Sequence, residues 1–124
     1  MPATERSLDL AMTAAKAADD KLATTVAGID VSEQLALTDV FVIVSASTDR
    51  QVGAIVDEVE DQLREKGAKP IRREGERDGR WVLLDFGDIV VHVQHDEERE
   101  FYELERLWKD CPEIDLGVPK RRDA

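Results

Sequence analysis

The sequence contains a single cysteine, Cys111, among 124 residues. One thiol can form neither an internal disulfide nor a cysteine-based zinc site, so this composition favours the reducing cytosol. Long apolar runs are also missing, because the longest, near residues 40–44 and 89–93, fall far below the roughly 20 residues that span a bilayer. The first six residues lack the basic and then apolar pattern of a signal peptide. We therefore expect a cytoplasmic protein with no membrane contact.

Basic residues are scarce as well. The chain has 17 Lys and Arg against 28 Asp and Glu, which gives a formal net charge of −11. Nucleic-acid affinity depends mainly on Lys and Arg that replace counterions on phosphates, so little direct nucleic-acid binding is expected. The short basic run at residues 120–122 is interpreted as a solubilising end, with RNA contact as the alternative. The charge balance instead favours a basic partner.

The apolar residues are sufficient for one folded domain. They make up 42% of the chain, and single domains peak at roughly 100–150 residues. Helical spacing after Ser7 predicts a first helix that Gly28 closes, followed by a short strand over residues 29–31. The apolar run 39–46 predicts a strand in the centre of a sheet. Ser47 or Thr48 is expected to cap a second helix that ends at Gly67 and buries Val52, Ile55, Val56, Val59 and Leu63.

A β-hairpin is expected next, after an exposed loop over residues 72–79. Two strands, 81–86 and 89–95, flank the dipeptide Gly87-Asp88, a turn with positive φ at its first position. This register pairs Phe86 with Ile89, Leu84 with Val91 and Val82 with Val93 on one apolar face. The other face carries a mixed set: Trp81, Leu83, Asp85, Val90, His92 and Gln94.

A third helix is predicted from Asp96 to Pro112. Its apolar stripe consists of Phe101, Leu104, Leu107, Trp108 and Cys111. We place the domain at residues 1–112 and expect residues 113–124 to form a disordered tail, since its end offers nothing to bury.

The candidates for chemistry are weak. His92 and His95 are three residues apart on a strand, so their side chains point to opposite faces and cannot converge on one metal ion. Ser45, Ser47 and Cys111 lack a base placed beside them, and the glycine loop at 75–79 carries acidic residues that would repel a phosphate. We therefore predict no catalytic residues, no metal and no cofactor. The enzyme alternative is a metal-dependent nucleotidyltransferase that uses Asp85, Asp88 and His92.

Aromatic residues make up only 5% of the chain, and two of them fall outside the predicted core. Trp81 belongs to the mixed hairpin face, and Tyr102 lies off the apolar stripe of the third helix, beside Arg106. Trp, Tyr and Arg dominate the energetics of protein interfaces. The alternative is that Trp81 only covers the edge of the core and that Tyr102 keeps its hydroxyl in solvent.

Five blocks of sequence together resemble one known family. They are DVFVIVS at 39–45, DRQV at 49–52, EG at 74–75, GRWVLLDFGDIVVH at 79–92 and REFYELERLW at 99–108. In this order and spacing the chain resembles the ribosomal silencing factor family, RsfS, also called Iojap-like. The resemblance covers nearly the whole predicted domain. It departs from the family at Ala46, where glycine is frequent, at Phe86, where tyrosine is frequent, and over residues 94–96.

The resemblance implies a fold and a partner. The fold would be α/β, a single domain with a mixed sheet of about five strands packed against helices, similar to a nucleotidyltransferase core without its catalytic motif. The partner would be the large ribosomal subunit, bound through ribosomal protein fourteen so that the small subunit cannot join. The partner-binding residues would include Trp81, Asp85, Asp88 and Tyr102, with Arg106 next to Tyr102. A homodimer remains open, because an edge strand could pair with a second copy.

Overall fold

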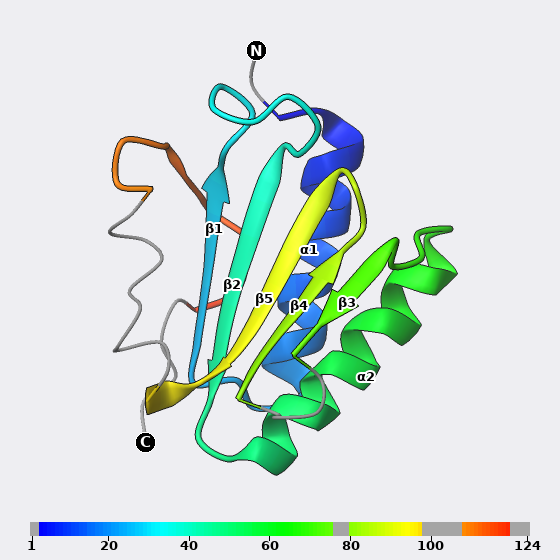
Figure 1. Cartoon of the computed structure of the whole chain (residues 1–124), viewed down its shortest axis with the longest axis vertical. Helices are drawn as coiled ribbons and strands as arrows, with labels where there is room; N and C mark the ends of the chain where they lie inside the picture. The colour runs from blue at the N-terminus through cyan, green and yellow to red at the C-terminus, as the bar shows by residue number, and fades with distance from the viewer. Residues whose placement is uncertain (1–2, 76–79, 98–107, 120–124) are drawn as a thin grey trace.

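The chain forms a mixed sheet with helices on one side (Figure 1). The computed structural model describes residues 3–75, 80–97 and 108–119. The elements in chain order are α1 (Glu5–Asp20), β1 (Thr25–Asp30), β2 (Val40–Ala46), α2 (Asp49–Glu65), β3 (Arg72–Glu74), β4 (Trp81–Asp85), β5 (Ile89–His95) and β6 (Glu113–Ile114). The strand order is β3-β4-β5-β2-β1-β6. Only β2 and β5 run parallel, and the other neighbours are antiparallel. The α/β class and the mixed sheet are confirmed, with six strands in place of about five.

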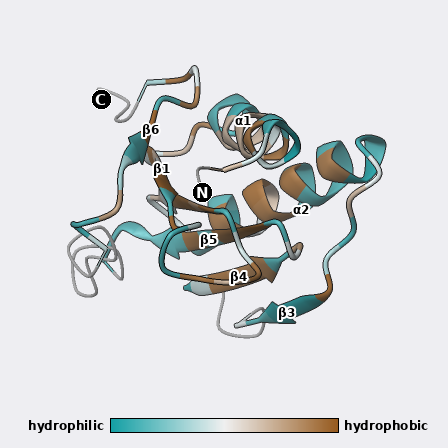
Figure 2. Ribbon diagram, turned by 90° about the horizontal axis from the view of Figure 1, so that it is seen from above, coloured by the Kyte–Doolittle hydropathy of each residue, from teal (hydrophilic) through white to brown (hydrophobic). Residues whose placement is uncertain are grey.

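Helices α1 and α2 cover the same face of the sheet (Figure 2). The apolar stripe of α2 consists of the five residues predicted from its spacing, all buried. Thr48 is its N-cap and accepts the backbone N–H of Gln51 at 3.1 Å. Gly67 follows the helix with a φ of +81°, the left-handed conformation that glycine adopts without a steric penalty. All seven residues of β2 are buried, as expected for a central strand.

The first helix differs from the prediction at both ends. Its N-cap is Thr4, while the buried Ser7 lies in the first turn and donates its hydroxyl to Asp39 at 2.7 Å. The helix ends at Asp20, and residues 25–28, which were assigned to it, begin β1. Val26 pairs with Val44 and Gly28 with Val42. Apolar residues in this alanine-rich segment also recur at helical spacing, but hydrogen bonding to the central strand decided its structure.

The β4–β5 hairpin has the predicted register. Val82 pairs with Val93 and Leu84 with Val91, and the Phe86 N–H donates to the Ile89 carbonyl at 2.9 Å. Gly87 has a φ of +87°, as the turn required. The preceding segment was wrongly assigned to a loop throughout, because residues 72–74 form β3 and pair with β4. Their exposed, charged side chains carry no apolar alternation that would reveal an edge strand.

The first residues of the predicted disordered tail are part of the folded sheet. Residues 113–114 form β6 against Gly28 and Ile29, and Leu116 is buried. A Cβ built on Gly28 would lie 2.7 Å from the Leu116 Cδ1, so the missing side chain of Gly28 provides the space that Leu116 fills. The disorder predicted for residues 113–119 is therefore wrong, and residues 120–124 lie outside the described part of the chain. Of the helix predicted from Asp96 to Pro112, Asp96 and Glu97 are helical, while residues 108–111 form a turn and a bend, so the prediction is wrong at its end. Residues 98–107 lie outside the described part of the chain.

Candidate protein-binding surface

The sheet face opposite α1 and α2 carries the described candidate residues. We call it the outer face. Its buried centre is a small apolar cluster that is separate from the main core, formed by Ile29, Val31, Phe41, Ile43 and Val90. Half-buried side chains pack against the margin of this cluster, among them Trp81, Leu83, Trp108 and Cys111. The outer face is therefore apolar at its centre and partly accessible along β4.

Trp81 opens β4 and is half-buried, with its indole against the cluster. Its Nε1–H donates to the Nδ1 of His92 at 3.3 Å, and the two rings lie 6.1 Å apart between centroids. An indole that is packed on one side and accessible on the other is a common anchor in protein interfaces. The structure therefore confirms that Trp81 belongs to the outer face and shows it half-buried at the margin of the cluster.

His92 supports Trp81 from β5. Its side chain is 6% exposed and packs edge-on against Phe41, with ring centroids 5.0 Å apart. Burial disfavours the charged imidazolium and lowers the pKa of His92 to about 4. The ring is thus neutral near pH 7, which leaves Nδ1 free to accept the indole proton. The alternation along the hairpin predicted that His92 lies on this face, but no sequence signal indicated that it would accept the Trp81 indole proton.

Asp85 ends β4 at the edge of the same face. Its Oδ1 accepts the backbone N–H of Gly87 at 2.8 Å, which holds the hairpin turn, and its Oδ2 lies 3.8 Å from Nη2 of Arg72. Arg72 reaches this carboxylate from β3 and also lies 3.6 Å from Glu74. The β3 contribution was missed in the sequence, because the segment was assigned to a loop.

Asp88 lies in the turn itself and is exposed. Its backbone carbonyl accepts the N–H of Asp39 at 2.9 Å, so the turn is joined to the loop before β2. Asp85 and Asp88 therefore lie at the turn end of the hairpin, and Trp81 lies at the other end of β4. The other two candidates, Tyr102 and Arg106, lie outside the described residues.

Of the three residues in the enzyme alternative, Asp85 and His92 share the outer face, and Asp88 lies in the turn. His92 pairs with Leu83 across the hairpin, whereas Asp85 pairs with Val90, so these two candidates occupy successive positions on the outer face. His95 lies three residues from His92 on the same strand, with its Nδ1 accepting the N–H of Glu97 at 3.2 Å. Among residues 3–75, 80–97 and 108–119, no three His, Cys, Asp or Glu side chains are placed to hold a metal ion.

The nucleophile candidates also have structural partners. Ser45 is buried and its hydroxyl lies 2.5 Å from that of Thr25 on the neighbouring strand. Ser47 donates to the Gln51 side chain at 2.6 Å, while Thr48 is the N-cap. Cys111 is a free, half-buried thiol at the margin of the apolar cluster. These groups are therefore used in packing and capping.

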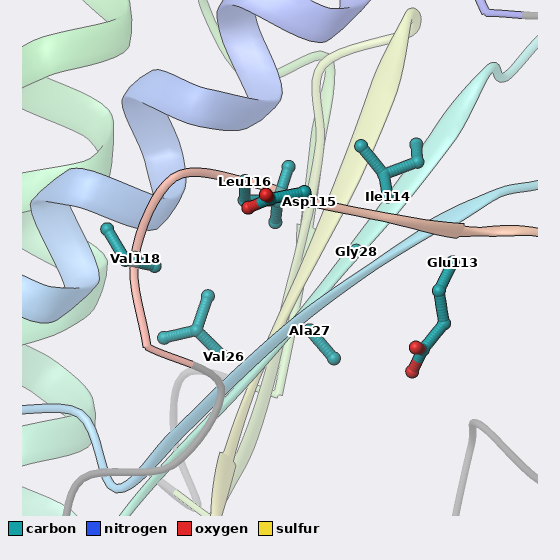
Figure 3. Close-up of a pocket in the computed structure, with 8 residues that line it drawn as sticks. All are labelled: Val26, Ala27, Gly28, Glu113, Ile114, Asp115, Leu116 and Val118. Carbon is teal, nitrogen blue, oxygen red and sulfur yellow. The ribbon is translucent and has the colours of Figure 1, made fainter.

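A pocket of about 460 Å³ lies away from the outer face, where the C-terminal segment arches over β1 (Figure 3). Its lining is mainly aliphatic, with two carboxylates: Val26, Ala27, Gly28, Glu113, Ile114, Asp115, Leu116 and Val118. None of the helices in the described residues is long and apolar enough to cross a membrane.

Comparisons with known proteins agree with this architecture. The family model described as "Ribosomal silencing factor during starvation" matches residues 4–124. The ribosomal silencing factor RsfS of Bacillus subtilis is 45% identical over 103 residues, covering 83% of this chain and 87% of that protein. The RsfS of Halalkalibacterium halodurans is 40% identical over 108 residues, covering 87% and 92%. A more distant relative from Mus musculus, 35% identical over 83 residues, is named mitochondrial assembly of ribosomal large subunit protein 1 and is covered to 36% of its length.

Solved structures give the same result. A crystal structure of a protein from Chromobacterium violaceum superimposes with a TM-score of 0.78 at 29% identity, covering 90% of this chain and 92% of that one. A structure from Bacillus halodurans reaches a TM-score of 0.75 at 38% identity, covering 86% and 97%. Sequence and fold therefore agree over most of the chain, which belongs to the ribosomal silencing factor (RsfS) family.

Proposed function

We propose that this protein silences ribosomes by binding the large subunit through ribosomal protein fourteen and by blocking its association with the small subunit. The role in ribosome silencing follows from the family. The name of the mouse relative also points to the large subunit. The single observation that carries the binding surface is Trp81, a half-buried indole fixed by a buried histidine at the edge of an apolar face.

The charge of the protein suits such a partner. Ribosomal proteins are basic, and this chain carries a net charge of −11. Opposite charge speeds the encounter of two proteins, while a few desolvated aromatic and arginine side chains provide most of the affinity. Trp81 with Asp85 and Asp88 would combine both contributions on one hairpin, and Tyr102 and Arg106 would extend the contact. The same charge supports binding to ribosomal protein rather than directly to RNA.

Silencing by this route needs no catalytic step. A folded domain bound at the joining face of the large subunit occupies space that the small subunit must enter, so steric exclusion is sufficient. We accordingly propose a cytoplasmic protein that is not an enzyme and needs no cofactor. In the homodimer alternative, the same outer face or an edge strand would contact a second copy of the chain. A measurement of the oligomeric state in solution distinguishes this alternative from ribosome binding.

The test uses purified protein with isolated ribosomal subunits. We expect cosedimentation with large subunits and not with small ones, and a lower extent of subunit association measured by light scattering. Addition of free ribosomal protein fourteen should compete for the protein and restore association. Equal binding to both subunits, or unchanged association at saturating protein, would contradict the proposal.

A further inference from the structure

Two exposed hydrophobic side chains lie at one end of the sheet. Leu37 is 87% exposed and Ile71 is 74% exposed, more than the other large exposed hydrophobic residues of the described chain, Met12 and Leu22. Leu37 belongs to the loop between β1 and β2, and Ile71 directly precedes β3. Both segments lie at the same end of the sheet as the β4–β5 turn (Figure 1). We call Leu37, Ile71 and the turn residue Asp88 the hairpin end.

These segments are attached to the turn by hydrogen bonds. The hydroxyl of Thr38, next to Leu37, donates to the Gly87 carbonyl at 3.2 Å, and the Asp39 N–H donates to the Asp88 carbonyl at 2.9 Å. The Ile71 N–H donates to the Asp85 carbonyl at 2.6 Å. The Ile71 Cδ1 also lies 3.1 Å from the point where a Cβ of Gly87 would be. The backbone segments that carry Leu37 and Ile71 are therefore attached on either side of one turn.

Carboxylates accompany these apolar groups. Asp88 is exposed in the turn, and Asp85 lies two residues before Gly87 at the edge of the outer face. The nearest cation on β3, Arg72, lies within 4 Å of both Asp85 and Glu74. The hairpin end therefore combines exposed apolar area with negative charge, and Asp85 makes it continuous with the outer face that carries Trp81.

We propose that the hairpin end is part of the docking surface and that the partner meets it with an apolar spot bordered by Lys or Arg side chains. The proposal rests on the proposed function and extends its contact beyond Trp81. Isolated surface hydrophobic residues are common, but two of them lie here beside one acidic turn, at the other end of the strand that begins with the candidate anchor Trp81. This combination matches the mixture of apolar centre and charged rim found in protein interfaces. A second copy of this chain fits less well, because its net charge of −11 would repel an equally charged surface.

The test compares single serine variants in a binding assay with isolated large ribosomal subunits and with free ribosomal protein fourteen. Leu37→Ser and Ile71→Ser should each raise the dissociation constant about tenfold, the effect of losing one buried aliphatic contact. Met12→Ser is the matched control, since Met12 is 46% exposed on α1, which covers the opposite face of the sheet. It should bind as the unmodified protein does. Thermal melts should be nearly unchanged for all three, because none of the side chains is buried.

The outcomes separate this inference from the function on which it rests. If the unmodified protein binds large subunits and the Leu37 and Ile71 variants bind equally well, the hairpin end is not part of the interface and the proposed function stands. If the unmodified protein does not bind large subunits, both fail. If these variants bind normally but convert a dimer to a monomer in sedimentation equilibrium, a second copy occupies the hairpin end and the proposal is overturned.

Discussion

At the scale of single residues, the outer face depends on a contact between an indole and a neutral imidazole. The Trp81 Nε1–H needs an acceptor, and His92 provides one at 3.3 Å only while its Nδ1 is unprotonated. Burial keeps the imidazole neutral by lowering its pKa to about 4. The alternation of side chains along the hairpin was sufficient to predict that both residues share a face. The hydrogen bond between them depends on side-chain rotamers, which the sequence pattern does not determine.

The first prediction concerns Trp81. Trp81→Ala should weaken binding to ribosomal protein fourteen by about 2 kcal/mol, roughly thirtyfold in dissociation constant, because an interface anchor is lost. The half-buried indole should contribute only about 1–2 kcal/mol to the free energy of unfolding. Leu84→Ala, at a fully buried position on the opposite face of β4, is the control and should lose about 2–5 kcal/mol of stability.

Affinity and thermal melts measured on the same Trp81 and Leu84 variants decide between an anchor and a core residue. Trp81 is a core residue if Trp81→Ala unfolds as easily as Leu84→Ala, and it is no anchor if the stable variant binds at full strength. We expect the same loss of affinity for Tyr102→Ala, at a position outside the described residues.

The second prediction uses the pH dependence of His92. Its pKa is about 4 in the folded protein and about 6.5 in the unfolded chain, so the unfolded chain binds more protons between these values. The contribution of His92 to stability is therefore complete above pH 6.5 and is lost as the pH falls toward 4, by about 3 kcal/mol. His92→Asn keeps an acceptor near Trp81 but does not titrate, so this part of the pH dependence should disappear.

Urea unfolding of both proteins at pH 7.5 and 4.5 measures the difference, with His95→Asn as the control at a half-buried position on the same strand. Carboxylates that titrate in the same range affect all three proteins equally. An unchanged difference between pH 7.5 and 4.5 in His92→Asn would show that the imidazole is already solvated in the folded protein.

At the scale of elements, strong patterns predicted the structure and short elements escaped prediction. The stripe of α2 and the register of β4 with β5 follow from regular spacing of apolar residues over many positions. Strand β3 has three exposed charged residues, and β6 has only two residues, so neither carries a pattern. Both strands form by hydrogen bonding to the edges of a sheet whose centre consists of the apolar strands β2 and β5. The predicted end of α1 was wrong for a different reason. The alanine and valine residues between positions 23 and 28 are compatible with a helix and with a strand.

The third prediction concerns β6 and the segment that follows it. Gly28→Ala should displace Leu116, because the new Cβ would lie 2.7 Å from its Cδ1. The expected loss is about 1.5–3 kcal/mol in the free energy of unfolding, the value of burying one leucine. Leu116→Ala should lose a similar amount, and the double variant should lose no more than Leu116→Ala alone, since the two changes act on one contact.

Denaturant unfolding of the two single variants and the double variant forms a complete thermodynamic cycle. Additive losses would show that Gly28 matters for its own strand and not for the docking of Leu116. Binding to large subunits should be unaffected throughout, because this contact is on the helix-covered side of the sheet.

At the scale of the whole molecule, the negative charge and the apolar outer face have different roles in binding. Long-range attraction acts before contact and is screened by salt, with a Debye length of about 10 Å at 0.1 M. Apolar contacts form only after docking and respond weakly to salt. The net charge of −11 should therefore control the rate of association with a basic partner, and Trp81 should control the rate of dissociation.

The last prediction separates these two roles by kinetics. Raising the salt concentration from about 0.05 to 0.5 M should slow association with ribosomal protein fourteen by about tenfold or more and change dissociation little. Asp88→Lys should slow association in the same way at low salt, because it reverses an exposed charge in the turn. Trp81→Ala should instead speed dissociation. Surface-immobilised ribosomal protein fourteen allows both rates to be measured for each variant. An association rate that is independent of salt would mean that the acidic surface faces away from the partner, and that the outer face finds its target by apolar contact alone.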